Sequence, residues 1–168
     1  MNIIVAVDSN WGIGYNGTQP VVLPEDRSFF RKITSGGTVI VGRRTLADFP
    51  GGRPLKNRHN IIMSTDPDFT VEGAEVAHSV EEAVALTAGD RPYRVFVIGG
   101  ARVYEQFLPY CERAFVTRIR GEYDADRFFE NLDLSPNWEL QKKGAPRFHD
   151  GVEYSFDVYG NKAPIRFT

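Results

Sequence analysis

The sequence predicts an α/β domain with a mostly parallel central sheet of eight strands, four flanking helices and an antiparallel C-terminal hairpin. Two observations support this fold class. Before Glu112, short apolar runs rich in β-branched residues alternate with segments of helical periodicity, as in successive βαβ units. After Glu112 no helical pattern recurs, and three segments with alternating apolar residues predict strands, the last two paired antiparallel.

The apolar runs before Glu112 are bounded by turn residues, which places the strand ends. Pro24 suits the first turn of a helix that Gly36 and Gly37 stop, and Ser79 with Glu82 forms a capping box. The predicted strands are residues 2–8, 38–41, 59–64, 75–77, 94–98, 114–119, 138–142 and 153–159. The other predicted helices are residues 42–50, 79–86 and 101–108. A glycine-rich loop at residues 9–20 has a length that suits either a functional lid or a plain connector.

The composition is that of an ordinary globular domain. The chain has 168 residues, 42% hydrophobic and 25% charged, with a net charge of −2, which predicts one domain over residues 1–168. The first apolar run is too short to span a bilayer. One cysteine, Cys111, and three scattered histidines give no internal disulfide and no metal-ligand spacing. We expect a metal-free, cytoplasmic monomer that binds neither nucleic acid nor membrane.

The helix that begins at Pro24 carries a carboxylate on its apolar face. At about 100° per residue, Asp26 lies between Phe29 and Ile33 on one side and Phe30 on the other. An ionised carboxylate there is costly unless a polar group meets it. Asp26 is therefore either a functional acid or a first-turn residue hydrogen-bonded to the backbone.

Two predicted strands end in glycine and continue directly into a helix, at residues 41–45 and 98–102. Glycine lets an anion approach the backbone, and the free N–H groups of a helix's first turn point toward it. Arginines in both first turns oppose the helix dipole, a cost that a bound anion would offset. The two corners favour a ligand with separated phosphates, such as a dinucleotide with an extra 2′-phosphate. The G-x-G-x-x-G fingerprint is absent, which disfavours a standard Rossmann unit.

The chain resembles dihydrofolate reductase over nearly its full length. The resemblance implies an NADPH-dependent enzyme that passes a hydride from C4 of NADPH to C6 of dihydrofolate, with a proton delivered to N5. It also implies a role in one-carbon metabolism as an antifolate target. The matching segments follow the family's order: residues 4–7 with 10–14, 23–26 with 29–30, 41–45, 53–55 with 58–61, 97–101 with 103–104, and 116–119.

The resemblance implies that Asp26 and Thr117 are the catalytic residues. Asp26 would accept hydrogen bonds from the pterin, and desolvation would raise its pKa so that a proton stays within reach of N5 through water. Thr117 would bridge Asp26 and the pterin 2-amino group, and Arg58 would pair with the α-carboxylate of the glutamate tail. The implied substrate set is Ile4, Val5, Asp26, Arg27, Phe30, Arg31, Arg53, Leu55, Arg58, Ile98, Tyr104 and Thr117.

For NADPH, the resemblance implies that Ala6 and the loop at residues 12–18 hold the carboxamide. The 2′-phosphate would meet Arg43, Ser64 and Thr65, with the diphosphate on the two glycine corners. In this family the bond corresponding to Gly99–Gly100 is cis. The implied cofactor set is Ala6, Ile13, Gly14, Gly17, Thr18, Gly42, Arg43, Arg44, Thr45, Ser64, Thr65, His78, Ile98, Gly99, Gly100, Ala101, Arg102, Val103 and Tyr104.

Several of these residues also have plain structural interpretations. Arg53 and Arg58 could be solvated loop charges, and His78 could be a surface residue. Thr117 could be an ordinary residue of an alternating strand, and Tyr104 could serve helix packing alone.

The chain departs from the family pattern at three positions. Val21 stands where the family usually has a tryptophan that packs on the pterin and holds an ordered water. Arg27 stands at a usually apolar position, and we expect it to add positive charge on the benzoyl-glutamate side. Ala125 stands where a glycine often precedes the aspartate, which affects contacts between its loop and residues 9–20.

Two other functions fit the same fold. A pyrimidine reductase of riboflavin synthesis would need a phosphoribosyl site and would need neither Asp26 nor Arg58. A non-catalytic pterin- or NADP-binding homologue is compatible with the missing tryptophan.

Overall fold

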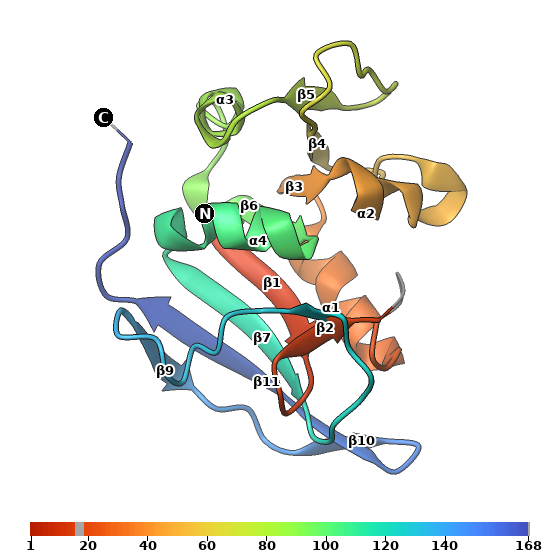
Figure 1. Cartoon of the computed structure of the whole chain (residues 1–168), viewed down its shortest axis with the longest axis vertical. Coiled ribbons are helices and arrows are strands. Elements are labelled where there is room, and N and C mark those ends of the chain that lie inside the picture. Colours follow the sequence, from red (N-terminus) through yellow and green to blue (C-terminus); the bar gives the residue numbers. More distant parts are fainter. Residues whose placement is uncertain (16–18, 168) are drawn as a thin grey trace.

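The computed structural model describes residues 1–15 and 19–167 and confirms the predicted α/β class (Figure 1). The four helices of these residues are α1 (Pro24–Thr34), α2 (Arg43–Ala47), α3 (Val80–Leu86) and α4 (Ala101–Phe107). Short 3₁₀ turns occur at Pro50–Gly52, Pro92–Arg94 and Leu108–Tyr110. The strands are β1 (Asn2–Val7), β2 (Gly12–Gly14), β3 (Thr38–Gly42), β4 (His59–Met63), β5 (Glu75–Ala77), β6 (Val95–Gly99), β7 (Arg113–Ile119), β8 (Arg127–Phe128), β9 (Trp138–Lys142), β10 (Arg147–His149) and β11 (Val152–Asn161).

The main sheet follows the order β10-β11-β7-β1-β6-β3-β4-β5, and β9 pairs with β11 as a ninth strand. All pairs from β7 to β5 are parallel. The long strand β11 runs antiparallel to β7, β9 and β10, which confirms the antiparallel C-terminal end. Strands β2 and β8 form a separate antiparallel pair.

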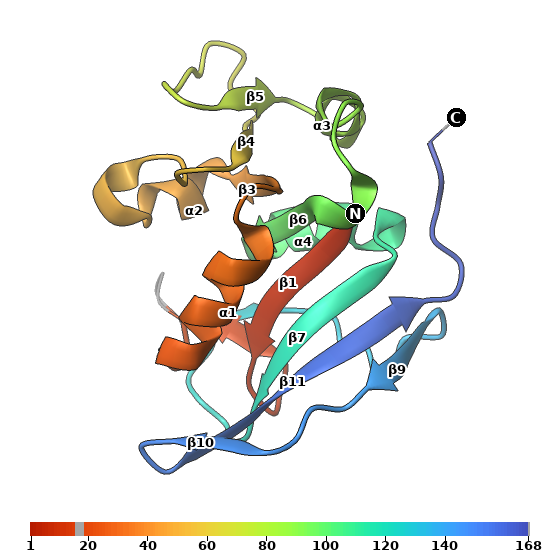
Figure 2. The same ribbon diagram turned by 180° about the vertical axis from the view of Figure 1, so that it is seen from behind.

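The sheet separates two apolar layers. Helix α4 covers one face and α1 the other, as the opposite views in Figures 1 and 2 show. The main core gathers Ile3, Ile40 and Val97 with Val103 and Phe107 of α4. On the opposite face, Phe29 of α1 stacks on Phe156 of β11, with ring centroids 5.0 Å apart. Alternate residues of each central strand thus serve the two layers, as expected for a sheet buried on both faces.

Pairing between β1 and β6 stops early. Only Asn2 and Ile3 of β1 pair with β6, whereas β1 stays paired with β7 along its whole length. The last residues of β1 and β6 therefore diverge at the carboxyl edge of the parallel sheet. Ligands of open α/β sheets bind at this edge, where neighbouring strands separate.

Three short strands were not expected from the sequence pattern, namely β2, β8 and β10. Each has only two or three residues, which is too few for an alternating pattern to stand out. The start of α3 also differs in detail from a full capping box. Ser79 Oγ accepts from Glu82 N as expected, but the Glu82 carboxylate accepts from His78 N rather than from Ser79 N.

A histidine links several elements at the amino edge of the sheet. His59, at the start of β4, contacts Asp90 through Nδ1 at 2.7 Å and Glu75 of β5 through Nε2 at 2.5 Å. Thr38 Oγ1 of β3 also donates to Asp90. Partial burial of the ring opposes its charge, but the hydrogen bonds to Glu75 and Asp90 outweigh this and raise the pKa of His59 above its ordinary value.

This geometry predicts a pH-dependent contribution of His59 to stability. Because the pKa is raised on folding, the contribution is fully present below the ordinary histidine pKa of about 6.5 and is lost as pH rises through the folded value. Replacing His59 with glutamine should lower Tm by about 2–4 °C at pH 6 and by less at pH 9. Thermal denaturation at both pH values measures this, with His149→Gln as the control because, among the described residues, the ion pair of His149 is with the exposed Asp150. An equal loss at the two pH values for His59→Gln would contradict the assignment.

Candidate active site

The carboxylate of Asp26 meets a hydroxyl on the sheet. Thr117 Oγ1 of β7 donates to Asp26 Oδ1 at 2.6 Å, although the two residues are 91 positions apart in the chain. Helix α1 begins at Pro24 with Glu25 and Asp26 in its first turn, which complements the helix dipole. Asp26 is half-buried and Thr117 is 3% exposed, so the carboxylate faces the sheet rather than bulk water.

Burial governs the protonation of this acid. Desolvation raises the pKa of Asp26 above its ordinary value, and the hydrogen bond from Thr117 opposes the rise in part. A carboxyl group in this state takes up a proton more readily than a solvated aspartate. It also accepts hydrogen bonds from any donor placed beside it when it is ionised.

A backbone carbonyl at the divergence of β1 and β6 faces the same region. Tyr104 of α4 donates its hydroxyl proton to Ile4 O at 2.7 Å, and both residues are buried. Burial and the nearby charge of Asp26 raise the pKa of Tyr104, so the hydroxyl stays neutral and remains a donor. The side chain of Val5 instead packs into the main core on the α4 face, away from Asp26.

A buried amide holds the loop that carries Arg58. Asn60 of β4, 2% exposed, accepts from Leu55 N and donates to the carbonyl oxygens of Leu55 and Arg58. Arg58 Nε donates to Thr34 Oγ1 at the end of α1, and Arg58 Nη1 donates to Lys56 O. Partial burial, together with the charge of Arg31, lowers the pKa of Arg58. The hydrogen bonds to Thr34 and Lys56 hold the guanidinium of Arg58 in place. Among the described residues no carboxylate pairs with it, so it is available to an anion.

The other predicted substrate residues surround this arrangement more loosely. Phe30 is half-buried on α1, whereas Arg27, Arg31 and Arg53 are exposed. Within the described part of the chain, the side chains of Arg27 and Arg31 form no ion pair, and the two are four residues apart on one side of α1. Like charges at this spacing oppose each other in a helix, and an anion between them would relieve the repulsion.

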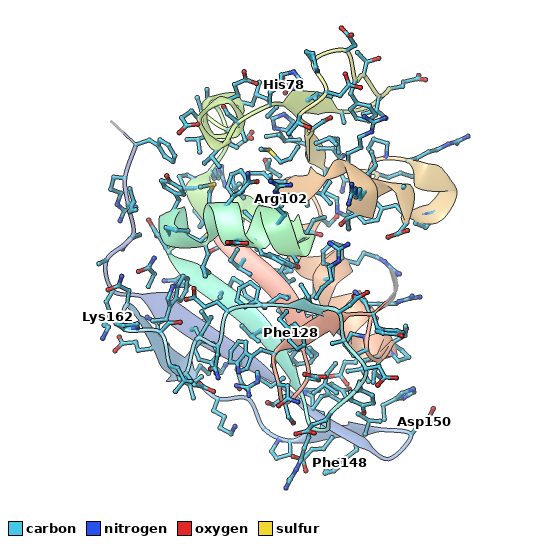
Figure 3. All side chains as sticks on the ribbon, in the orientation of Figure 1. His78, Arg102, Phe128, Phe148, Asp150 and Lys162 are labelled. Atoms are coloured by element: carbon cyan, nitrogen blue, oxygen red, sulfur yellow. The ribbon has the colours of Figure 1, made fainter. Side chains whose placement is uncertain are left out.

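The two glycine corners lie against each other. A Cβ atom on Gly100 would come within 2.9 Å of Thr45 Oγ1, and one on Gly42 would come within 3.1 Å of Val103 Cγ2. Gly99 has φ of +125°, a conformation that side-chain-bearing residues rarely adopt, and the Gly99–Gly100 bond is cis as the resemblance implies. Ala101 is half-buried, while Arg44 and Arg102 are exposed beside the corners, with Arg102 on α4 in Figure 3. The two glycine turns therefore form one continuous backbone surface, called here the shared cradle, and not two separate sites.

A second polar group lies beyond α2. Arg43 contacts Asp66 at 3.4 Å and lies 4.1 Å from the centroid of the Phe69 ring. Ser64 directly follows β4, and its carbonyl oxygen contacts His78 Nδ1 at 2.8 Å. Figure 3 shows His78 beyond the end of β5. Thr65 is exposed next to Ser64. The predicted residues Arg43, Ser64 and His78 directly follow β3, β4 and β5, three parallel strands that end on this side of the sheet.

A buried carboxylate anchors the loop that follows β1. Asp8 is fully buried and accepts from the backbone N–H groups of Asn10, Gly12 and Tyr123. Ile13 and Gly14 lie on β2, and Gly14 O accepts from Asp126 N. A Cβ on Gly12 would come within 2.8 Å of the Ala125 Cβ, so the loop of Ala125 closely contacts this segment. The predicted cofactor residues Gly17 and Thr18 lie outside the described residues.

The position of the expected tryptophan is apolar here. Val21 and Ala6 are partly buried and pack against the cluster of Leu23, Ile119 and Tyr154. Valine has no hydrogen-bonding group, so nothing on this side chain can hold an ordered water.

Two surface hollows lie apart from Asp26. The larger, about 410 Å³, lies over β7 and β11 and is lined by polar residues such as Arg118, Asp133 and Asp157. The smaller, about 340 Å³, lies beside Gly36, Gly37 and Arg94. Neither hollow is lined by a residue predicted to bind substrate or cofactor. The candidate site is therefore located by the hydrogen bonds and charges around Asp26 and not by these hollows.

Three residues with clear roles were missed by sequence reasoning as site residues: Asp8, Asn60 and Asp66. A polar residue inside or at the end of an apolar strand was the available signal for Asp8 and Asn60. Asp66 lies in an exposed turn, and no sequence pattern connects it to Arg43.

Among the described residues there is also no group of three or more acidic, histidine or cysteine side chains suited to a metal ion. In the same part of the chain, no helix has the length and apolar character needed to cross a membrane.

Comparisons with known proteins agree with this geometry. A family model described as dihydrofolate reductase matches residues 1–161. Dihydrofolate reductase of Bacillus subtilis is 37% identical over 164 residues, covering 96% of this chain and 95% of the relative. That of Neisseria gonorrhoeae is 34% identical, covering 96% and 98%.

A solved structure gives the same result in three dimensions. Dihydrofolate reductase from Enterococcus faecalis, complexed with NADP(H) and RAB-propyl, superposes with a TM-score of 0.83. It is 33% identical in sequence, and the match covers 95% of each chain. The chain belongs to the dihydrofolate reductase family.

Proposed function

We propose that this protein reduces 7,8-dihydrofolate to 5,6,7,8-tetrahydrofolate with NADPH, adding a hydride at C6 and a proton at N5. The observation that carries the proposal is the half-buried Asp26 held by Thr117 at the start of α1. Family membership and the relatives' activity support the same reaction. A pyrimidine reductase has no use for an acid at this position.

The residues at the carboxyl edge of the sheet fit the cofactor. In the shared cradle of Gly42, Gly99 and Gly100, a Cβ at Gly100 would clash with Thr45 and one at Gly42 would crowd Val103, and the backbone there is open to a diphosphate. Arg43, with Ser64 and Thr65 nearby, would hold the 2′-phosphate, and Ala6 with β2 would hold the carboxamide. NADPH, when bound there, supplies the hydride.

The chain's own residues would orient the pterin and manage its proton. Asp26 would accept hydrogen bonds from the pterin N3–H and 2-amino group, with Thr117 bridging to the same amino group. The carbonyl oxygens of Ile4 and Ile98 would accept from the pterin at the divergence of β1 and β6. Because its pKa is raised, Asp26 would hold a proton within reach of N5 through water.

The tail of the substrate would lie along α1. Phe30 would pack on the pterin side, and Leu55 would line the benzoyl group. Arg58 would pair with the α-carboxylate through its planar fork. Arg27 and Arg31 would add positive charge at the exposed rim, with Arg53 farther out.

We also propose a single-domain, cytoplasmic monomer that is an antifolate target. One continuous main sheet across residues 2–161 supports the single domain. Val21 in place of tryptophan is expected to alter antifolate affinity, because it removes a hydrogen-bonding group beside the pterin site.

The proposed reaction is tested by following NADPH absorbance with dihydrofolate, for the wild type and for Asp26→Asn. Asparagine cannot take up the proton, so kcat/KM should fall by about 100-fold or more at neutral pH. The wild-type rate should fall as pH rises through the raised pKa of Asp26, and this inflection should be absent from the variant. Full turnover by Asp26→Asn at pH 7 would contradict the role of the acid. Tight NADPH binding without any turnover by the wild type would indicate a non-catalytic binding protein.

The tail assignment is tested by Arg58→Gln. Loss of charge-assisted hydrogen bonds should raise KM for dihydrofolate by about 10- to 100-fold, with less effect on a dihydropterin that lacks the glutamate tail. Arg27→Leu should raise the same KM by about two- to five-fold, because Arg27 is exposed and contacts between exposed charges are weak. Arg120→Gln is the matched control, since Arg120 is an exposed arginine whose ion-pair partner is Glu153 of β11. Equal effects on tailed and tail-free substrates would rule out a carboxylate contact.

A further inference from the structure

The guanidinium of Arg43 already has an anionic neighbour on this chain. Arg43 Nη1 lies 3.4 Å from Asp66 Oδ2, and the two side chains are 50% and 47% exposed. Arg43 also lies over the Phe69 ring at 4.1 Å, which confines the guanidinium from one side. Arg43, the proposed ligand of the 2′-phosphate, is thus already paired with a carboxylate of this chain.

The turn that carries Asp66 holds its carboxylate in this position. Asp66 N donates to Ser64 Oγ at 3.2 Å, and Asp66 Oδ1 accepts from Asp68 N at 2.9 Å. One carboxylate oxygen is therefore engaged by the turn, while the other faces Arg43. Because Ser64 Oγ accepts this bond, its own proton remains free to be donated.

A phosphate group at this place would meet two opposite effects. Arg43 and the hydroxyl of Ser64 would both favour an anion. The Asp66 carboxylate would repel it and would have to give up its contact with Arg43. A cofactor without a 2′-phosphate would leave the Arg43–Asp66 pair intact.

We propose that Asp66 is a specificity-determining residue that lowers affinity for cofactors carrying a 2′-phosphate and so narrows the preference for NADPH over NADH. The inference rests on the proposed function, since it takes Arg43 as the phosphate ligand. Exposed ion pairs of this kind contribute modestly, so the change in affinity on removing the charge is about two- to five-fold.

The test measures equilibrium binding of NADPH and NADH, each without substrate, to the wild type and to Asp66→Asn. Asparagine keeps an oxygen for Asp68 N, so the turn is retained while the charge is lost. The dissociation constant for NADPH should fall about two- to five-fold, and that for NADH should not change. Asp68→Asn is the matched control: it removes an acid two residues away whose side chain does not contact Arg43, and it should change NADPH binding less than Asp66→Asn.

Each other outcome overturns the inference. Weaker NADPH binding by Asp66→Asn would mean that Asp66 orients Arg43 for the phosphate instead of competing with it. An equal change for NADPH and NADH would mean that the effect does not pass through the 2′-phosphate. Arg43→Gln separates this result from the proposed site: if its NADPH-to-NADH affinity ratio equals that of the wild type, Arg43 is not the phosphate ligand. Dihydrofolate turnover is measured separately and tests the proposed function itself.

Discussion

The contact between Thr117 and Asp26 is the constraint on which the site depends. It joins the first turn of α1 to the middle of β7, which lies next to β1 in the sheet. Helix α1 is held against the same face by Phe29, whose ring packs on Phe156 and Phe115. The apolar packing brings the carboxylate out of water, and the hydroxyl supplies the polar partner that a buried acid requires. Burial therefore favours the protonated form of Asp26, whereas the hydrogen bond from Thr117 favours the ionised form.

The rest of the site lies where the pairing between β1 and β6 stops early. Beyond Ile3, β1 no longer pairs with β6, and the carbonyl of Ile4 is met by the hydroxyl of Tyr104 instead. At the same edge, β3 and β6 each turn through glycine into a helix, and the two turns pack so closely that a Cβ on Gly100 would contact Thr45. A flat ring can thus be held by the separated strands while a phosphate-bearing ligand lies on the adjoining turns. Both features follow from local backbone geometry rather than from any one side chain.

Much of this could be predicted from residue patterns, because each central strand is a continuous apolar run and each helix has a clear start. The helical periodicity of residues 24–34 was enough to identify Asp26 as an acid on an apolar face. Its partner Thr117 could be assigned only by resemblance, since nothing local links residues 91 positions apart. The anchoring of Arg58 by Asn60, the hydrogen bonds of Asp8 and the pairing of Arg43 with Asp66 depend on how turns fold against the sheet. Periodicity does not report on such turns. The strands β2, β8 and β10 were missed for a related reason: each is defined by its pairing with another strand, and its two or three residues carry no alternating pattern of their own.

The most direct measurement is a titration of the Asp26 carboxyl carbon by NMR in the protein without ligands, for the wild type and for Thr117→Val. Burial should move the midpoint above the ordinary aspartate value of about 3.9, and removing the Thr117 hydroxyl should move it higher still. A midpoint at or below 3.9 would show that residue 26 is a solvated first-turn acid, and a downward shift in Thr117→Val would show that the hydroxyl does not stabilise the ionised carboxylate; either result contradicts the proposed role of the Thr117–Asp26 contact.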